Sequence, residues 1–297
     1  MTAGLIEQKP LIEEYLKKSV RPTSSFSFVN IFAWRDFFQF EFKVIHKNLC
    51  IFATNELGTF LYLPPLGENV STETVEECFH TMAEKNNGSG VSRIENVGED
   101  LLHLFPEKKY RRTVKADEYC YYRKDIVELS GNPYKSKRWA YNHFIKNYPA
   151  VFLPYGPSLL EECMALYDDW AEGRREVYQD EVYRQMLDEN RRVHELLLRH
   201  FDQLGLIGRV VKVNNEIKGY TFGFALSEDI FCVYSEITDL KSRGCAVYLF
   251  SEFCGDQALQ QYKFINVMDD FALHNIEKTK RSFHPVLLFP SYVIQRD

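Results

Sequence analysis

Two stretches of the chain, one in each half, alternate apolar and polar residues over three consecutive segments. They cover residues 40–64 and 208–239. In the first stretch the segments are separated by His46-Lys47-Asn48 and by residues 55–58, which are rich in turn-forming types. Such alternation is typical of half-buried strands, and short polar breaks between the runs are typical of hairpins. The sequence therefore predicts three antiparallel strands in each half of the chain.

Helical patterns surround both sets of strands. They are expected over residues 5–19, 26–38, 72–85, 158–173, 177–203 and 241–253. A chain of 297 residues fits two domains better than one hydrophobic core. We therefore expect an α/β fold with mixed sheets, built as two lobes with a sheet each. The boundary is predicted near residues 154–157, which gives domains of residues 1–154 and 155–297.

A short helix rich in basic and aromatic residues is predicted over residues 132–148. Asn132 or Ser130 can cap it, Pro133 suits its first turn, and Pro149 ends it. One face is expected to carry residues spaced three or four apart: Tyr134, Lys137, Arg138, Tyr141, Phe144, Ile145 and Tyr148. Cations among aromatic rings suit a wall that binds a phosphate-bearing ligand. The alternative is that the cationic side chains pack their stems over the rings.

The net charge of −6 is unevenly distributed along the sequence. Residues 107–148 hold eleven basic and five acidic residues, whereas residues 161–190 hold three basic and ten acidic ones. The basic segment is consistent with a polyanionic partner such as RNA. The two segments could equally lie against each other, so that charge alone leaves both interpretations open.

Composition argues against several classes of protein. The seven cysteines and eight histidines are dispersed without a metal-ligand spacing, which predicts neither a metal site nor a disulfide framework. No window holds the 18 or more apolar residues that a membrane span requires, and the N-terminal residues include acids where a signal peptide is basic. We therefore expect a cytoplasmic protein that does not insert stably into a membrane.

The predicted basic helix and the residues before it resemble the central signature of a known family. The residues that carry the resemblance are Leu129, Ser130, Gly131, Tyr134, Lys135, Lys137, Arg138, Asn142, Phe144, Tyr148 and Pro149. The family is built on the C-terminal catalytic domain of phosphatidylglycerol lysyltransferase. The resemblance spans most of the chain and implies two tandem acetyltransferase-like (GNAT) lobes joined by the basic helix, as in the Fem-type aminoacyl transferases.

The end of the chain resembles the closing motif of the same family. The matching residues are Asn266, Asp270, Lys280, Ser282, Phe283 and Pro285. Two positions depart from the family pattern: Ala272 stands where glycine is favoured, and Glu277 stands where arginine is favoured. The second change removes a cation from the side where the resemblance places the donor.

Residues 241–246, Lys-Ser-Arg-Gly-Cys-Ala, partly match the GNAT loop that binds the pyrophosphate of coenzyme A. That loop reads (Gln/Arg)-x-x-Gly-x-(Gly/Ala), and Lys241 replaces its first residue. Gly244 and Ala246 match its two other defined positions, and Arg243 directly precedes the glycine; backbone amides at such a helix start can bind an anion. The alternative is an ordinary helix start.

The resemblance implies an acyl- or aminoacyltransferase that moves an activated group from aminoacyl-tRNA or acyl-coenzyme A. The acceptor would be an amine or hydroxyl of a small molecule or peptide, and no tightly bound cofactor is expected. Lys280 would stabilise the oxyanion or a phosphate, Asp270 would act as a base or orient the donor ammonium, and Asn266 would support it. Tyr134, Lys137, Arg138 and Tyr141 would bind the donor phosphates, together with the loop residues Lys241, Arg243, Gly244 and Ala246.

A second interpretation comes from the two departures, Ala272 and Glu277. They favour a GNAT-like protein that has kept a binding cleft but lost its chemistry. Such a protein would serve as a ligand-binding or interaction module.

Overall fold

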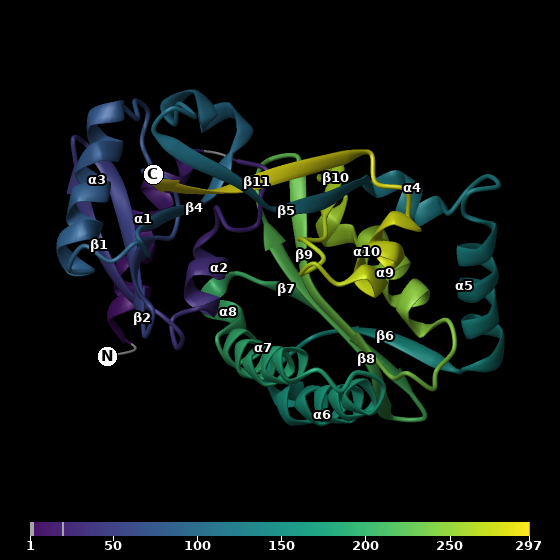
Figure 1. Ribbon diagram of the computed structural model, residues 1–297. Helices are drawn as coiled ribbons and strands as arrows, with labels where there is room; N and C mark the ends of the chain where they lie inside the picture. The colour runs from purple at the N-terminus through teal and green to yellow at the C-terminus, as the bar shows by residue number, and fades with distance from the viewer. Residues whose placement is uncertain (1–2, 20, 297) are drawn as a thin grey trace. The chain divides into compact units, whose positions relative to one another are not determined.

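The computed structural model describes residues 3–19 and 21–296 (Figure 1). Its described residues form two compact units. Unit 1 consists of residues up to Glu118 together with Asp269–Ile276 and the chain from Leu288, whereas unit 2 consists of Tyr119–Met268 and Glu277–Leu287. These units divide the chain at residue 118 and not at 154, and the basic helix lies in unit 2.

Unit 1 begins with α1 (Ala3–Lys17) and α2 (Phe28–Ala33), which is much shorter than the expected helix of residues 26–38. Its strands are β1 (Gln39–Ile45), β2 (Asn48–Asn55), β3 (Gly58–Leu61), β4 (Arg93–Gly98) and most of β11 (Leu287–Arg296). The three-strand prediction for residues 40–64 is confirmed, because β1, β2 and β3 pair antiparallel in sequence order. Helix α3 (Thr72–Lys85) follows, with Ser71 as its N-cap, and a 3-10 helix spans Glu99–Leu104.

Unit 2 contains the second predicted set of strands, which is also confirmed: β7 (Ile207–Val213), β8 (Glu216–Ala225) and β9 (Ile230–Thr238) pair antiparallel in order. Strand β6 (Ala150–Pro154) pairs with β7 at one edge. The short strand β10 (Phe264–Asn266) pairs parallel with β9 and antiparallel with β5 (Tyr110–Tyr122). The helices are α4 (Arg123–Glu128), α5 (Lys135–Asn147), α6 (Leu160–Val177), α7 (Glu181–Arg199), α8 (Phe201–Leu204) and α9 (Cys245–Gly255).

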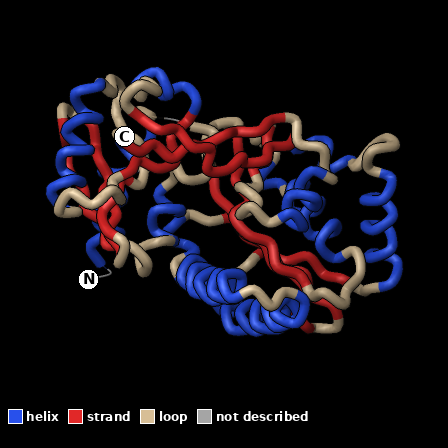
Figure 2. Tube along the Cα trace, in the orientation of Figure 1, coloured by secondary structure: helices blue, strands red, loops and turns tan. Residues whose placement is uncertain are grey.

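Helices cover both faces of the β8 and β9 strands. On one face, His194 of α7 bonds to Tyr220 of β8 and to Ser235 of β9. Gly219, the neighbour of Tyr220, faces the opposite side, where it lies against Leu249 and Cys245 of α9. Successive residues of a strand point to opposite faces, so α9 packs on the face opposite α7. Figure 2 shows α6 and α7 running side by side along these strands.

Strand β5 is shared by the two units. Its first part belongs to unit 1, where Ser291 of β11 donates to the carbonyl of Ala116. Its last part belongs to unit 2, where Tyr122 is paired with Phe264 of β10. The strand order of the described residues is β1-β2-β3-β4-β11-β5-β10-β9-β8-β7-β6. The expectation of a separate sheet in each lobe was therefore wrong, because one strand contributes to both.

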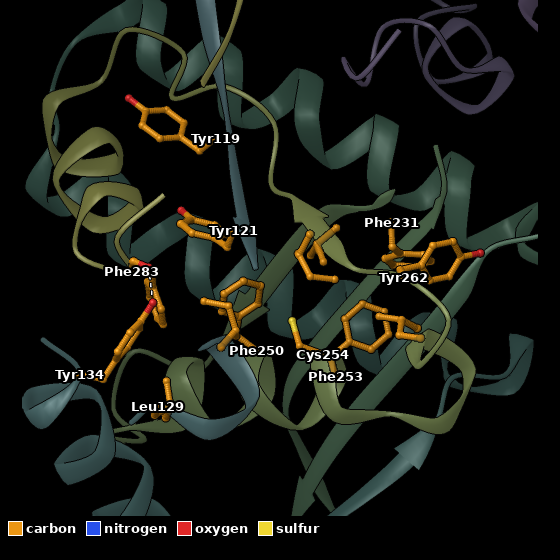
Figure 3. Packing of buried hydrophobic residues seen from close by; sticks show 14 residues of the cluster. Tyr119, Tyr121, Leu129, Tyr134, Phe231, Phe250, Phe253, Cys254, Tyr262 and Phe283 are labelled. Atoms are coloured by element: carbon orange, nitrogen blue, oxygen red, sulfur yellow. Dashed lines mark hydrogen bonds between the residues drawn. The ribbon is translucent and has the colours of Figure 1, made fainter. Parts of the chain in front are cut away.

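The core of unit 2 lies between α9 and the strands β5, β9 and β10. Aromatic rings dominate it, and Figure 3 shows Tyr121, Tyr134, Phe250 and Phe283 grouped together. Phe250 and Phe283 meet edge to face with their ring centroids 5.2 Å apart. Aromatic pairs in this geometry stabilise a core beyond the area that they bury. This core holds α5 and the residues after α10 (His274–Arg281) close to α9.

Among the described residues, no helix has the length and apolar character needed to cross a membrane.

Candidate functional site

Helix α5 is the basic and aromatic helix of the sequence, and it begins later than predicted. It spans Lys135–Asn147, and Tyr134 at its N-cap makes no side-chain capping bond. The capping prediction for Asn132 was wrong: the backbone carbonyl of Asn132, and not its side chain, accepts from Lys135. The helix ends as predicted before Pro149, because Tyr148 has an extended backbone.

The inner face of α5 packs on α9. Phe144 is fully buried, and its ring centroid lies 4.8 Å from that of Tyr248. Cys245 and Leu249 complete this contact. Ile145, which was expected on the same face, is instead half exposed. Phe144 is therefore the main apolar contact between α5 and α9.

Three side chains hold the segment of residues 280–283. Tyr121 donates to the carbonyl of Lys280 at 2.9 Å. Tyr134 donates to the carbonyl of Phe283 at 2.9 Å, the bond that is dashed in Figure 3. Lys137 donates from Nζ to Ser282 Oγ at 2.6 Å, with its ammonium 3.8 Å from the centre of the Phe283 ring. Burial lowers the pKa of Lys137. The predicted donor residues Tyr134 and Lys137 thus position the end of the C-terminal motif.

Arg138 and Tyr141 are also engaged inside unit 2. The Arg138 guanidinium donates to the carbonyls of Leu129 and Gly131, two residues in the left-handed conformation. Tyr141 donates to the carboxylate of Glu252 on α9. Among the described residues neither Arg138 nor Lys137 forms an ion pair with residues 161–190, so the predicted alternative of pairing with the acidic helices was wrong.

Asn266 and Lys280 converge on one turn. The Asn266 carboxamide is fully buried, and its Oδ1 accepts from the backbone N–H of Met268 at 2.7 Å. Lys280 Nζ donates to the carbonyl of Val267, which lies within the same turn, at 2.6 Å. The structure therefore brings these two predicted residues together at the end of β10.

Asp270, the third predicted catalytic residue, belongs to unit 1. Its Oδ1 accepts from the backbone N–H of Ala272 at 2.9 Å. Because α10 begins at His274, Asp270 is not the N-cap of that helix. Ala272 has a φ of 56°, a conformation that glycine adopts at lower cost, which explains why glycine suits this position.

The second departure, Glu277, is neutralised locally. Its carboxylate accepts from Arg281 Nε at 2.7 Å, one helical turn away. The Arg281 guanidinium also lies 5.6 Å from the centre of the Tyr119 ring.

The loop of residues 241–246 is covered by α5. A Cβ on Gly244, whose φ is 90°, would lie 2.2 Å from the carbonyl oxygen of Ala140. The N–H of Cys245 donates to Ser242 and that of Arg243 to Lys241, so two amides of the predicted anion loop are already used. Lys241 and Ala246 are exposed. Gly244 here permits the close approach of α5.

Two buried titratable groups lie outside the predicted site. His194 bridges Tyr220 and Ser235 at 2.8 Å each, and its burial lowers its pKa to about 3. Glu236 of β9 has its Oε2 shielded from solvent without a partner among the described residues, and desolvation raises its pKa to about 8. His194 lies on a helix and Glu236 on a strand whose sequence patterns predict only packing in the core. No local spacing could have identified these two residues.

A hollow of about 460 Å³ opens elsewhere on unit 2. It is lined by Tyr122, Arg123, Lys124, Asp125, Gln260, Gln261, Tyr262 and Lys263. None of the predicted site residues lines it. Arg123 is held there by the carbonyls of Tyr262 and Cys254.

The family model "Phosphatidylglycerol lysyltransferase, C-terminal" matches residues 17–295 of the chain. Among curated proteins, none matches the chain.

Three solved structures share the fold. A conserved protein of unknown function from Bacteroides thetaiotaomicron is similar with a TM-score of 0.86 and 24% identity, over 98% of this chain and 97% of that one. L-PGS from Bacillus licheniformis has a TM-score of 0.68 and 16% identity, over 97% and 91% of the two chains. A tandem GNAT protein from the clavulanic acid biosynthesis pathway has a TM-score of 0.53 and 7% identity, over 96% and 94%. The predicted tandem GNAT-like α/β fold is confirmed.

Proposed function

Because the chain belongs to the family of the phosphatidylglycerol lysyltransferase C-terminal domain, we propose that it transfers an aminoacyl or acyl group to an amine or hydroxyl acceptor. The observation that carries this proposal is the convergence of Asn266 and Lys280 on the turn after β10. The Lys280 ammonium donates to the carbonyl of Val267, and the buried Asn266 carboxamide fixes the backbone of the same turn. A positioned cation of this kind suits the stabilisation of an oxyanion.

The proposed reaction needs little covalent chemistry from the protein. The acceptor nitrogen or oxygen attacks the ester or thioester carbonyl of the donor, and a tetrahedral oxyanion forms. The bond to the leaving oxygen or sulfur then breaks, and the proton of the acceptor passes to the leaving group. Lys280 would donate to the oxyanion.

Aminoacyl-tRNA is the donor that the geometry favours over acyl-coenzyme A. The loop that would hold the pyrophosphate of coenzyme A is packed against the Ala140 carbonyl, and two of its amides are bonded within the loop. An anion approaching that helix start would have to displace α5. An ester on the end of an RNA does not need this loop, which supports the RNA-borne donor.

The test measures donor consumption by the purified protein. Radiolabelled aminoacyl-tRNA and acyl-coenzyme A are each supplied with the same panel of amine, peptide and lipid acceptors, and the transferred label is counted. Transfer from aminoacyl-tRNA is the expected result. Transfer from acyl-coenzyme A alone would contradict the choice of donor.

A non-catalytic binding module is the second candidate, and the Glu277–Arg281 ion pair favours it. This pair places a carboxylate where the family has a cation and neutralises a neighbouring arginine. Binding of either donor without any transfer across the acceptor panel would support the module over the enzyme.

A further inference from the structure

The outward face of α5 carries a stripe of basic and polar side chains around one tryptophan. Lys135, Trp139, Asn142 and Lys146 follow one another at intervals of four, three and four residues, which places them on one line along the helix. All four are exposed, and half of the Trp139 surface is accessible. Figure 1 shows α5 at the edge of unit 2, beside α9.

Within residues 3–19 and 21–296, no carboxylate neutralises the cations of this face. Helix α5 contains no acidic residue. Among the described residues neither Lys135, Lys146 nor Arg243 forms an ion pair with a carboxylate. The face therefore presents net positive charge, although the whole chain carries −6.

Trp139 is held in place by its neighbours. The Arg243 guanidinium lies 4.5 Å from the centre of the indole ring, and the His143 ring stacks on the indole at 5.0 Å with an angle of 18°. His143 is itself fixed by Asn147, which donates to its backbone carbonyl. An ordered, half-exposed aromatic ring next to an arginine suits stacking with a nucleobase or a ribose.

We infer that this outward stripe, Lys135, Trp139, Asn142 and Lys146 with Arg243, is a docking surface for RNA. The two lysines are about 16 Å apart along the helix, a length that spans several nucleotides of a backbone. This inference rests on the proposed function and deepens it, because it assigns the surface that carries the RNA of the donor. It also assigns the phosphate contacts to the outer residues Lys135 and Lys146. The inner residues Lys137 and Arg138 bond to other groups inside unit 2.

The pattern fits RNA better than a lipid surface. A helix that lies on a bilayer presents a broad apolar face, often with several large side chains together. The α5 stripe instead places one aromatic ring between two cations and an amide, and Ile145 is the large aliphatic residue beside it. Amides and cations hydrogen-bond phosphates and sugars, which is how proteins hold a nucleic-acid backbone.

The experiment measures binding of deacylated bulk tRNA to the intact protein by filter retention at several salt concentrations. We expect the double variant Lys135→Gln/Lys146→Gln to bind about tenfold more weakly. The slope of log affinity against log salt concentration should become shallower by about 2. Trp139→Ala should weaken binding at least about fivefold. The matched control is Lys17→Gln/Lys47→Gln, which removes two exposed lysines of unit 1 and should leave binding unchanged.

Equal loss of affinity in the control and in the α5 variant would overturn the inference, since the effect would then come from total charge. Wild-type affinity in the α5 variant would overturn it as well. A parallel sedimentation with vesicles of phosphatidylcholine and phosphatidylglycerol provides a third outcome: a variant that loses only vesicle binding would assign the stripe to lipid. Deacylated tRNA carries no amino acid to transfer, so this binding result does not depend on whether the protein catalyses the transfer reaction.

Discussion

Glu236 and His194 should impose opposite pH dependences on folding stability. The pKa of Glu236 is raised in the folded protein from 4.5 to about 8, and that of His194 is lowered from 6.5 to about 3. A raised carboxyl pKa makes the folded state bind an extra proton between pH 4.5 and 8, so stability falls there as pH rises. A lowered histidine pKa makes the unfolded state bind the extra proton between pH 3 and 6.5, so stability there rises with pH.

The two effects cancel where the ranges overlap. Each contributes a slope of about 1.4 kcal/mol per pH unit. Between pH 4.5 and 6.5 the folded state holds one proton on Glu236 and the unfolded state holds one on His194, so these groups leave stability nearly flat. Above pH 6.5 only the Glu236 slope remains. Because Glu236 ionises in the unfolded state but not in the folded state, its contribution to the free energy of unfolding at pH 7 is about 3 kcal/mol lower than at pH 4.5.

The substitution Glu236→Gln isolates this effect, because it keeps the shape of the side chain without its titration. The variant should match the wild type near pH 4.5 and exceed its unfolding free energy at pH 7 by up to about 3 kcal/mol. Urea denaturation followed by circular dichroism at pH 5, 6, 7 and 8 measures the difference. Glu216→Gln, an exposed change on β8, is the control. Parallel pH profiles for the wild type and Glu236→Gln would refute the reasoning.

Three further predictions concern contacts within unit 2. Phe144→Ala should lower the unfolding free energy by about 3–5 kcal/mol, because it empties a fully buried site between α5 and α9, and urea denaturation measures it. Gly244→Ala should lower the melting temperature more than Gly205→Ala: both glycines have positive φ, but only Gly244 has a backbone oxygen in the space of the new Cβ. Equal shifts would show that the contact with Ala140 does not matter. Tyr121→Phe should cost about 1 kcal/mol and reduce transfer without changing RNA binding, since it releases the Lys280 carbonyl; unchanged transfer would remove Tyr121 from the positioning of Lys280.

Local pattern was sufficient for the secondary structure that forms by local rules. Alternation and turn residues located all six hairpin strands, and Ser71 marked the start of α3. The short helix α4 was missed because it follows β5 directly and has only six residues. The length of α2 was overestimated because the apolar pattern continues through Trp34, Phe37 and Phe38. These three residues pack against one another outside the helix.

Longer-range features could not be predicted from spacing. Nothing in the sequence of β5 indicates that its two parts serve different units, because strand pairing depends on residues far away in the chain. The side of α5 that faces a ligand was also difficult to predict from spacing. Lys137 and Arg138 carry the charge expected of ligand contacts, yet their partners are Ser282 and the loop carbonyls of Leu129 and Gly131. The residues left exposed to a partner are Lys135, Trp139 and Lys146.

The most direct test of the proposed function compares Lys280→Ala with Lys278→Ala in a single-turnover transfer assay. Both changes remove a lysine from α10, but Lys278 is exposed, whereas Lys280 reaches the turn after β10. We predict that Lys280→Ala slows transfer from aminoacyl-tRNA by about 100-fold or more, and that Lys278→Ala retains the wild-type rate. Equal rates for the two variants, with both folded as judged by melting temperature, would contradict the assignment of Lys280 to the reaction.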